Sequence, residues 1–129
     1  MGLAERKIVQ GFKDGAFKTC LTEIQTICGF PLELDVDWGS IENDNYCSWI
    51  FENNKFNTSF FDRLKGALSN ICSDDMGKTA MKEKVKKIQF KNGVGDLTLN
   101  SGVFGIISSL TDTGTYGQEQ IQEFLEKKL

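Results

Sequence analysis

The sequence predicts an α+β fold: a single-domain two-layer sandwich, with about four helices packed on a small, mostly antiparallel sheet of about four to five strands. Two observations support this prediction. Apolar residues recur with helical spacing near the beginning, middle and end of the chain, whereas three short segments between Ile88 and Ser108 have a two-residue period. The chain has 129 residues and 40% hydrophobic content, which is enough to bury one core, so we expect one α+β domain spanning 1–129.

The N-terminal part of the chain is predicted to be helical. Residues 4–12 fit a first helical turn, and a longer helix is expected over 17–28. Asp14 is placed to cap the start of the longer helix, while Gly29 and Pro31 are typical of its end. Its apolar face comprises Phe17, Cys20, Leu21, Ile24, Ile27 and Cys28.

Residues 32–38 alternate strictly between apolar and acidic side chains, which is typical of a half-buried strand ended by Gly39. One face is expected to bury Leu32, Leu34, Val36 and Trp38. The other face is expected to expose Glu33, Asp35 and Asp37. The aromatic-rich stretch 40–56 fits a strand and a short helix equally well.

Two more helices are predicted in the middle of the chain. The first runs from Phe60 to Ile71 with helical apolar spacing, and Ser59 with Asp62 matches a capping box. Ser73 or Asp74 is expected to open the next helix. Its narrow apolar seam comprises Met81, Val85 and Ile88.

The two-residue period predicts short strands over 88–91, 96–100 and 103–108. Turn signals separate them, at Asn92-Gly93, Gly95 and Ser101-Gly102. A C-terminal helix is then expected to carry Ile121, Phe124 and Leu125 inward. These successive short strands are the reason for predicting hairpins and a mostly antiparallel sheet.

The chain contains no histidine, which excludes Ser-His-Asp and Cys-His catalysis and histidine-ligated metals. The four cysteines are too scattered in sequence to suggest a zinc site, and we expect reduced thiols in a cytoplasmic protein, with disulfides after export as the alternative. No apolar run approaches the ~20 residues of a membrane span. We therefore predict no catalytic residue, no metal site, no cofactor and no membrane contact.

Three short motifs resemble known sites but lack the residues that the chemistry needs. Met76-Gly77-Lys78-Thr79 has Cys72 where a P-loop requires glycine. Asp112-Thr113-Gly114-Thr115 matches an aspartic-protease tetrad without a second aspartate motif, and a Gly-rich turn explains it better. Counting from Asp35, an EF-hand loop would need glycine and glutamate where Ser40 and Tyr46 stand.

Residues 31–54 contain six acidic side chains and no lysine or arginine. Aromatic residues are interleaved with these acids, and an exposed ring bordered by carboxylates is typical of a protein-binding hot spot. The residues predicted to contact a partner are Glu33, Asp35, Asp37, Trp38, Tyr46 and Trp49. The alternatives are a solvated strand face, a site for a small molecule or divalent cation, and a carboxylate-dependent enzyme using Asp35 and Asp37.

The basic pole of the chain lies at residues 78–91, with six lysines against Glu83. Lys78, Lys82 and Lys86 are predicted to form one helical row able to bind an anion, although lysines in a last helical turn also complement the helix dipole. The absence of arginine from this segment and the overall pI of about 5.0 argue against nucleic acid. Docking of this helix on the acidic region would give a homo-oligomer.

From these patterns we predict a non-catalytic protein-interaction or regulatory domain that binds a protein partner through its acidic, aromatic-rich face. An inhibitor that plugs a basic enzyme, as an immunity-type protein does, is one concrete form of such a domain.

Overall fold

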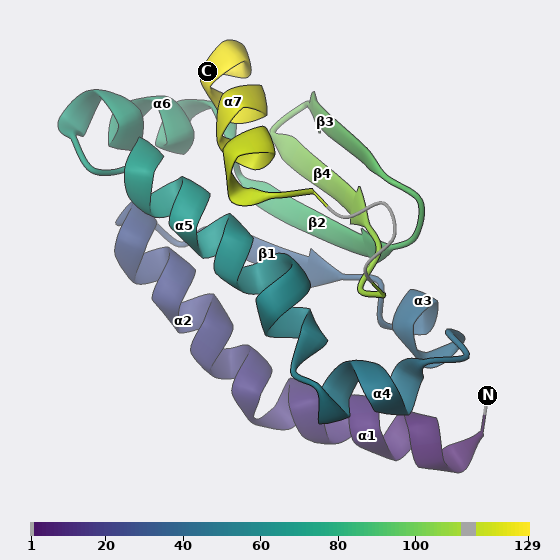
Figure 1. Ribbon diagram of the computed structural model, residues 1–129. Coiled ribbons are helices and arrows are strands. Elements are labelled where there is room, and N and C mark those ends of the chain that lie inside the picture. Colours follow the sequence, from purple (N-terminus) through teal and green to yellow (C-terminus); the bar gives the residue numbers. More distant parts are fainter. Residues whose placement is uncertain (1, 112–115) are drawn as a thin grey trace.

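The computed structural model describes residues 2–111 and 116–129, and it has four strands in one open mixed sheet (Figure 1). The strands are β1 (Glu33–Val36), β2 (Lys87–Asn92), β3 (Asp96–Asn100) and β4 (Val103–Ser108), in the spatial order β1-β2-β4-β3. Strands β1, β2 and β4 are mutually parallel, and only β3 runs antiparallel to its neighbour β4. The α+β class is confirmed.

Helices precede, separate and follow the strands. They are α1 (Leu3–Asp14), α2 (Ala16–Cys28), α3 (Trp38–Glu42), α4 (Cys47–Glu52), the π-helical segment η1 (Asn57–Phe61), α5 (Asp62–Ile71), α6 (Asp75–Lys84) and α7 (Gln118–Lys128). Helices α2, α5 and α7 cover one face of the sheet, while α1, α3 and α4 gather beyond one end of it (Figure 1). None of the helices described is long and apolar enough to cross a membrane.

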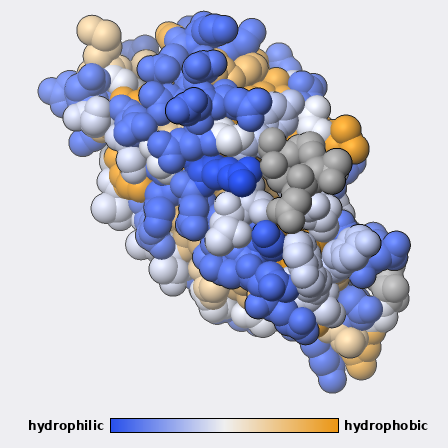
Figure 2. Space-filling model, in the orientation of Figure 1, coloured by the Kyte–Doolittle hydropathy of each residue, from blue (hydrophilic) through white to orange (hydrophobic). Residues whose placement is uncertain are grey.

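The strand period determines which side chains enter the core. Leu34, Val36, Ile88, Phe90 and Phe104 point to the helix-covered face and are buried. They pack with apolar residues of the helices in one cluster, in which Phe60 and Phe90 stack with ring centroids 3.9 Å apart. Hydrophilic residues predominate on the side of the molecule seen in Figure 2, where hydrophobic ones form only small scattered groups.

The predicted mostly antiparallel sheet is wrong, because the segment after β2 does not form a hairpin. Asn92 is buried at the end of β2, where its side chain forms hydrogen bonds with Asp44 and with the backbone of Leu110. Residues 93–95 then lead to β3, the strand at the opposite edge of the sheet from β1. Within residues 2–111 and 116–129, only the Ser101-Gly102 turn closes a hairpin. Both of its residues have positive φ, as a type I′ turn requires. The chain then returns between β3 and β2.

The strands predicted over 88–91, 96–100 and 103–108 are confirmed in position, and the C-terminal helix is present with Ile121 and Leu125 buried. The strand predicted over 32–38 ends at Val36 instead, because Asp37 caps α3 and Trp38 begins that helix. The structure has more helical segments than the predicted four. The stretch 40–56, for which the sequence left a strand and a short helix as alternatives, contains the end of α3 and all of α4 and no strand. The two-layer description is only partly right, because α1, α3 and α4 extend past the sheet. Residues 112–115, with the tetrad-like motif, lie outside the described residues.

Several predicted helix boundaries are wrong for local reasons. Asp14 is the last residue of α1, and Gly15 instead precedes α2. Ser59 caps nothing, because the backbone is already helical at Phe56 and Ser59 lies buried within η1. Gly29 does end α2 in a left-handed conformation, and Asp74 does cap α6 by accepting a hydrogen bond from the Gly77 amide at 2.8 Å.

Candidate functional site

The face of the sheet opposite the helices is uncovered within the described part of the chain. Side chains alternate along each strand, so the outward positions align in rows across the sheet. We call these positions the outer face. It comprises Glu33, Asp35, Lys87, Gln89, Lys91, Asp96, Thr98, Asn100, Val103, Gly105 and Ile107, with Asp37 continuing the line of β1.

The outer face is hollowed along its middle row. Asp35, Gln89, Gly105 and Thr98 occupy one register level on the four strands. Gly105 has no side chain there, and a Cβ built on it would lie 2.6 Å from the Thr98 Oγ1. The resulting groove has a volume of about 480 Å³, and Lys91 and Ile107 line it beside this row.

The carboxylates of the outer face differ in how far they are engaged. Glu33 approaches the Lys87 ammonium at 3.8 Å, but its side chain is 69% exposed, so this pair contributes little to stability. Asp37 is the N-cap of α3, and its carboxylate accepts from the Ser40 amide at 3.2 Å. The backbone of Asp35 pairs with β2, but its carboxylate makes no hydrogen bond or ion pair with any other described residue. Its carboxylate is therefore free to receive a donor from outside.

The centre of the groove is amphipathic. Lys91 and Gln89 stand on β2 with exposed side chains that make no hydrogen bond to another described residue. On the adjacent strand β4, Ile107 is half-buried and presents apolar surface in the groove beside these polar groups. A surface with apolar patches inside a polar, charged border has the composition of a protein interface.

The aromatic residues predicted to share this surface lie elsewhere. Trp38 is half-buried at the start of α3, where it packs on Phe17 at a centroid distance of 5.0 Å and stacks on Phe56 at 6.0 Å. Tyr46 is the N-cap of α4 and is 60% exposed, and Trp49 lies within α4 and is 37% exposed. Helix α4 packs against α1 (Figure 1). The acidic and aromatic parts of the predicted surface are therefore separate.

The predicted lysine row does not form along a helix. Lys78 and Lys82 are exposed on α6, but the helix ends at Lys84 because Val85 turns extended and is buried. Lys86 lies beyond the end, and its ammonium folds back to the Lys82 carbonyl oxygen at 2.6 Å.

The described residues contain no cluster of three or more cysteine or acidic side chains that could hold a metal ion. Sequence reasoning missed five groove residues of the outer face, namely Gln89, Lys91, Thr98, Gly105 and Ile107. The available signal was Gly105, because glycine inside a strand often marks a close approach by another group. No protein-family model, curated protein or solved structure matches this chain.

Proposed function

We propose that the protein is a non-catalytic interaction or regulatory domain that binds a protein partner through the outer face of its sheet. The observation that carries the proposal is the groove over Gly105, on a sheet face that no described helix covers. Parallel strands are usually covered on both faces of a sheet, and two of the three strand pairs here are parallel, so the open face favours a partner that covers it.

The charges of the outer face support a partner of basic character. Three carboxylates follow one another along β1 and its extension, and the two lysines of the face lie on β2. Glu33 is engaged by Lys87, whereas Asp35 has no ligand among the described residues. A lysine or arginine from a partner would meet Asp35, and an apolar side chain beside it would meet Ile107 in the groove. An inhibitor of a basic enzyme is one protein of this kind.

A lysine introduced into the groove tests the proposal. Thr98→Lys places a long cation on the groove floor at an exposed position, so we expect affinity purification from cells that make the protein to recover a specific partner with wild type and not with the variant. Thr19→Lys is the matched control, because Thr19 is exposed on α2 and away from the sheet. The proposal would be contradicted if the Thr98→Lys and Thr19→Lys variants recovered the partner equally well. It would also be contradicted if neither the wild type nor Thr19→Lys recovered any partner at low salt.

A small molecule is the second candidate occupant, since the groove volume of about 480 Å³ lies within the range of ligand pockets. In this version Asp35 and Asp37 contact the ligand or a divalent cation. We expect a rise in melting temperature with a metabolite mixture or a divalent ion, and loss of that rise in the double variant Asp35→Asn, Asp37→Asn. A shift that persists in the double variant excludes the two carboxylates as ligands.

A further inference from the structure

Two cysteines that are 44 residues apart in sequence are in contact in the core. The Sγ atoms of Cys28 and Cys72 lie 3.7 Å apart, and both residues are buried. Cys28 is the last residue of α2, and Cys72 is the C-cap of α5. The sulfurs would need to approach by roughly 1.7 Å to reach the length of a disulfide bond, near 2.05 Å.

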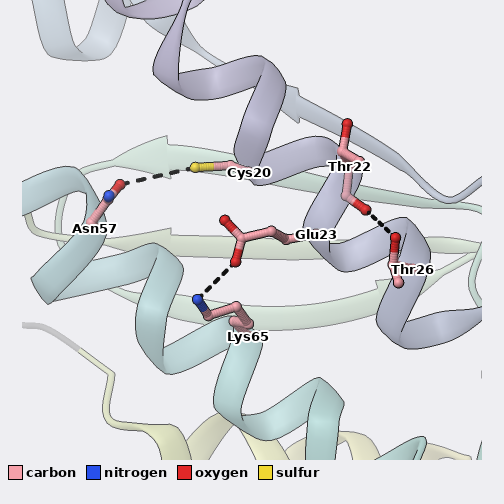
Figure 3. Close-up of polar contacts among 6 residues, drawn as sticks. All are labelled: Cys20, Thr22, Glu23, Thr26, Asn57 and Lys65. Carbon is pink, nitrogen blue, oxygen red and sulfur yellow. Dashed lines mark hydrogen bonds and ion pairs between the residues drawn. The ribbon is translucent and has the colours of Figure 1, made fainter.

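The contact is fixed by the register of the two helices. Helices α2 and α5 run side by side in the same direction (Figure 1). Cys20 faces Asn57 at 4.0 Å, and three residues further along α2, Glu23 pairs with the Lys65 ammonium at 2.8 Å (Figure 3). Cys28 and Cys72 form the next contact in this series. These three contacts share one register of α2 against η1 and α5, and this register brings the two thiols together at the C-terminal ends of α2 and α5.

The two thiols are also chemically unequal. The hydrogen bond that Cys72 shares with Cys28 and, more weakly, the positive charge of Lys78 lower the pKa of Cys72, although burial opposes them. The pKa of Cys28 is raised, because the group shares this hydrogen bond with Cys72 and because it is buried. Within this pair, the two pKa shifts favour ionisation of Cys72 over ionisation of Cys28. The other two thiols are disfavoured as nucleophiles, since burial raises the pKa of both Cys20 and Cys47.

We propose that Cys28 and Cys72 form a site of reversible oxidation, at which a hydroperoxide converts the thiol pair to an intramolecular disulfide that ties the end of α2 to the end of α5. This proposal is independent of the binding role of the outer face. It goes beyond the sequence-based expectation of four unconnected thiols, because only the fold brings this pair together.

The oxidation has two steps that balance. The Cys72 thiolate attacks one oxygen of hydrogen peroxide, the O–O bond breaks, and the products are a Cys72 sulfenic acid and hydroxide, which takes up a proton to become water. The Cys28 sulfur then attacks the Cys72 sulfur. The S–S bond forms, the S–O bond breaks, and the departing hydroxide leaves with the Cys28 proton as a second water. Two thiols lose two electrons and one peroxide gains them.

Access to Cys72 is through the short connection between α5 and α6. The residues on either side of the connection, Ile71 and Asp74, line a surface hollow of about 350 Å³ formed with α6 and α7. Ser73, next to the thiol, is exposed. Cys72 itself is buried, and we take this connection as the route by which hydrogen peroxide reaches it.

Peptide mapping of the full chain tests the proposal without any substitution. The folded, reduced protein is treated with hydrogen peroxide, alkylated under denaturing conditions and cut after glutamate. Glu23, Glu33, Glu42, Glu52 and Glu83 then separate all four cysteines into different peptides. We expect one disulfide, joining residues 24–33 to residues 53–83, with Cys20 and Cys47 alkylated.

Further measurements accompany the map. The oxidised protein should melt roughly 10 °C higher than the reduced one, because the bond closes a long loop in the unfolded chain, and dithiothreitol should reverse the shift. In Cys28→Ser, a dimedone-reactive sulfenic acid should accumulate on Cys72. A disulfide that includes Cys20 or Cys47, or one that links two chains, would overturn the proposal. So would four free thiols in the folded protein, at a peroxide concentration that oxidises the thiols of the denatured chain. Because the wild-type map stands alone, failure of the serine variant to fold leaves the test intact.

Discussion

Asn92 is the position at which one substitution should affect the fold most selectively. Its side chain is buried at the end of β2 and makes three hydrogen bonds. The amide nitrogen donates to the Asp44 carboxylate at 2.8 Å and to the Ser40 carbonyl oxygen at 3.2 Å, and its oxygen accepts from the Leu110 amide at 2.9 Å. Asn92 thus joins β2 to α3, to the loop before α4 and to the segment after β4.

Asn92→Leu keeps the approximate shape of the side chain and removes these hydrogen bonds. The Leu110 amide is buried, so leaving it without an acceptor costs about 1–3 kcal/mol. Asp44 and Ser40 are only partly buried and recover water, so their losses are nearer 1 kcal/mol each. Burial of the added apolar surface offsets about 1 kcal/mol. The net loss is about 3 kcal/mol, or a fall of roughly 10 °C in melting temperature for a chain of this length.

The assay is denaturant unfolding followed by circular dichroism, with Asn100→Leu as the matched control. Asn100 is exposed at the end of β3 and its side chain makes no hydrogen bond to another described residue, so its replacement should change the unfolding free energy by less than about 0.5 kcal/mol. If both variants unfold at the same denaturant concentration with the same slope, the energetic role assigned to Asn92 is wrong.

Three further predictions concern stability. Gly77→Ala should lower the unfolding free energy by about 3 kcal/mol or more, because the new Cβ would overlap the last turn of α5. Gly11→Ala on α1 meets no atom within 4 Å and should raise the unfolding free energy by about 0.5–1 kcal/mol, and thermal melts of the two variants test this difference. Asp74→Ala removes the N-cap of α6 and should lower the unfolding free energy by about 1 kcal/mol in urea titrations. Burial raises the pKa of Cys20 from 9.0 to about 11 in the folded state, so stability is retained below pH 9 and falls by up to about 3 kcal/mol between pH 9 and 11. Unfolding measured across this range should show a shallower loss in Cys20→Ala, and an unchanged slope would contradict the assignment.

The local periodicity of the sequence was sufficient to predict most elements. The last strand was predicted over 103–108 and observed over the same residues, because alternation and the Ser101-Gly102 turn agree there. Where two local signals competed, the prediction was wrong. Residues 32–38 alternate as one strand, yet Asp37 caps α3 by accepting a hydrogen bond from the Ser40 amide, and Trp38 begins that helix.

The sheet order and the groove could not be predicted, because both depend on contacts between distant segments. The buried side chain of Asn92, at the end of β2, bonds to partners that lie 18 to 52 residues away in sequence. The acids of β1 were expected on one face, and they are there. The groove beside them consists of residues from three other strands, and no local pattern brings Gly105 opposite Thr98.

The central claim is that the outer face is the surface that binds a protein partner. A photoreactive phenylalanine analogue placed at Thr98, in the groove, tests this claim most directly, with the same analogue at Thr19 on α2 as the control. After irradiation of cells that make the protein, we expect a discrete crosslinked species from position 98, weakened in Asp35→Lys and absent from position 19. Equal crosslinking from both positions, or none from position 98 while position 19 gives a discrete product, would contradict the account.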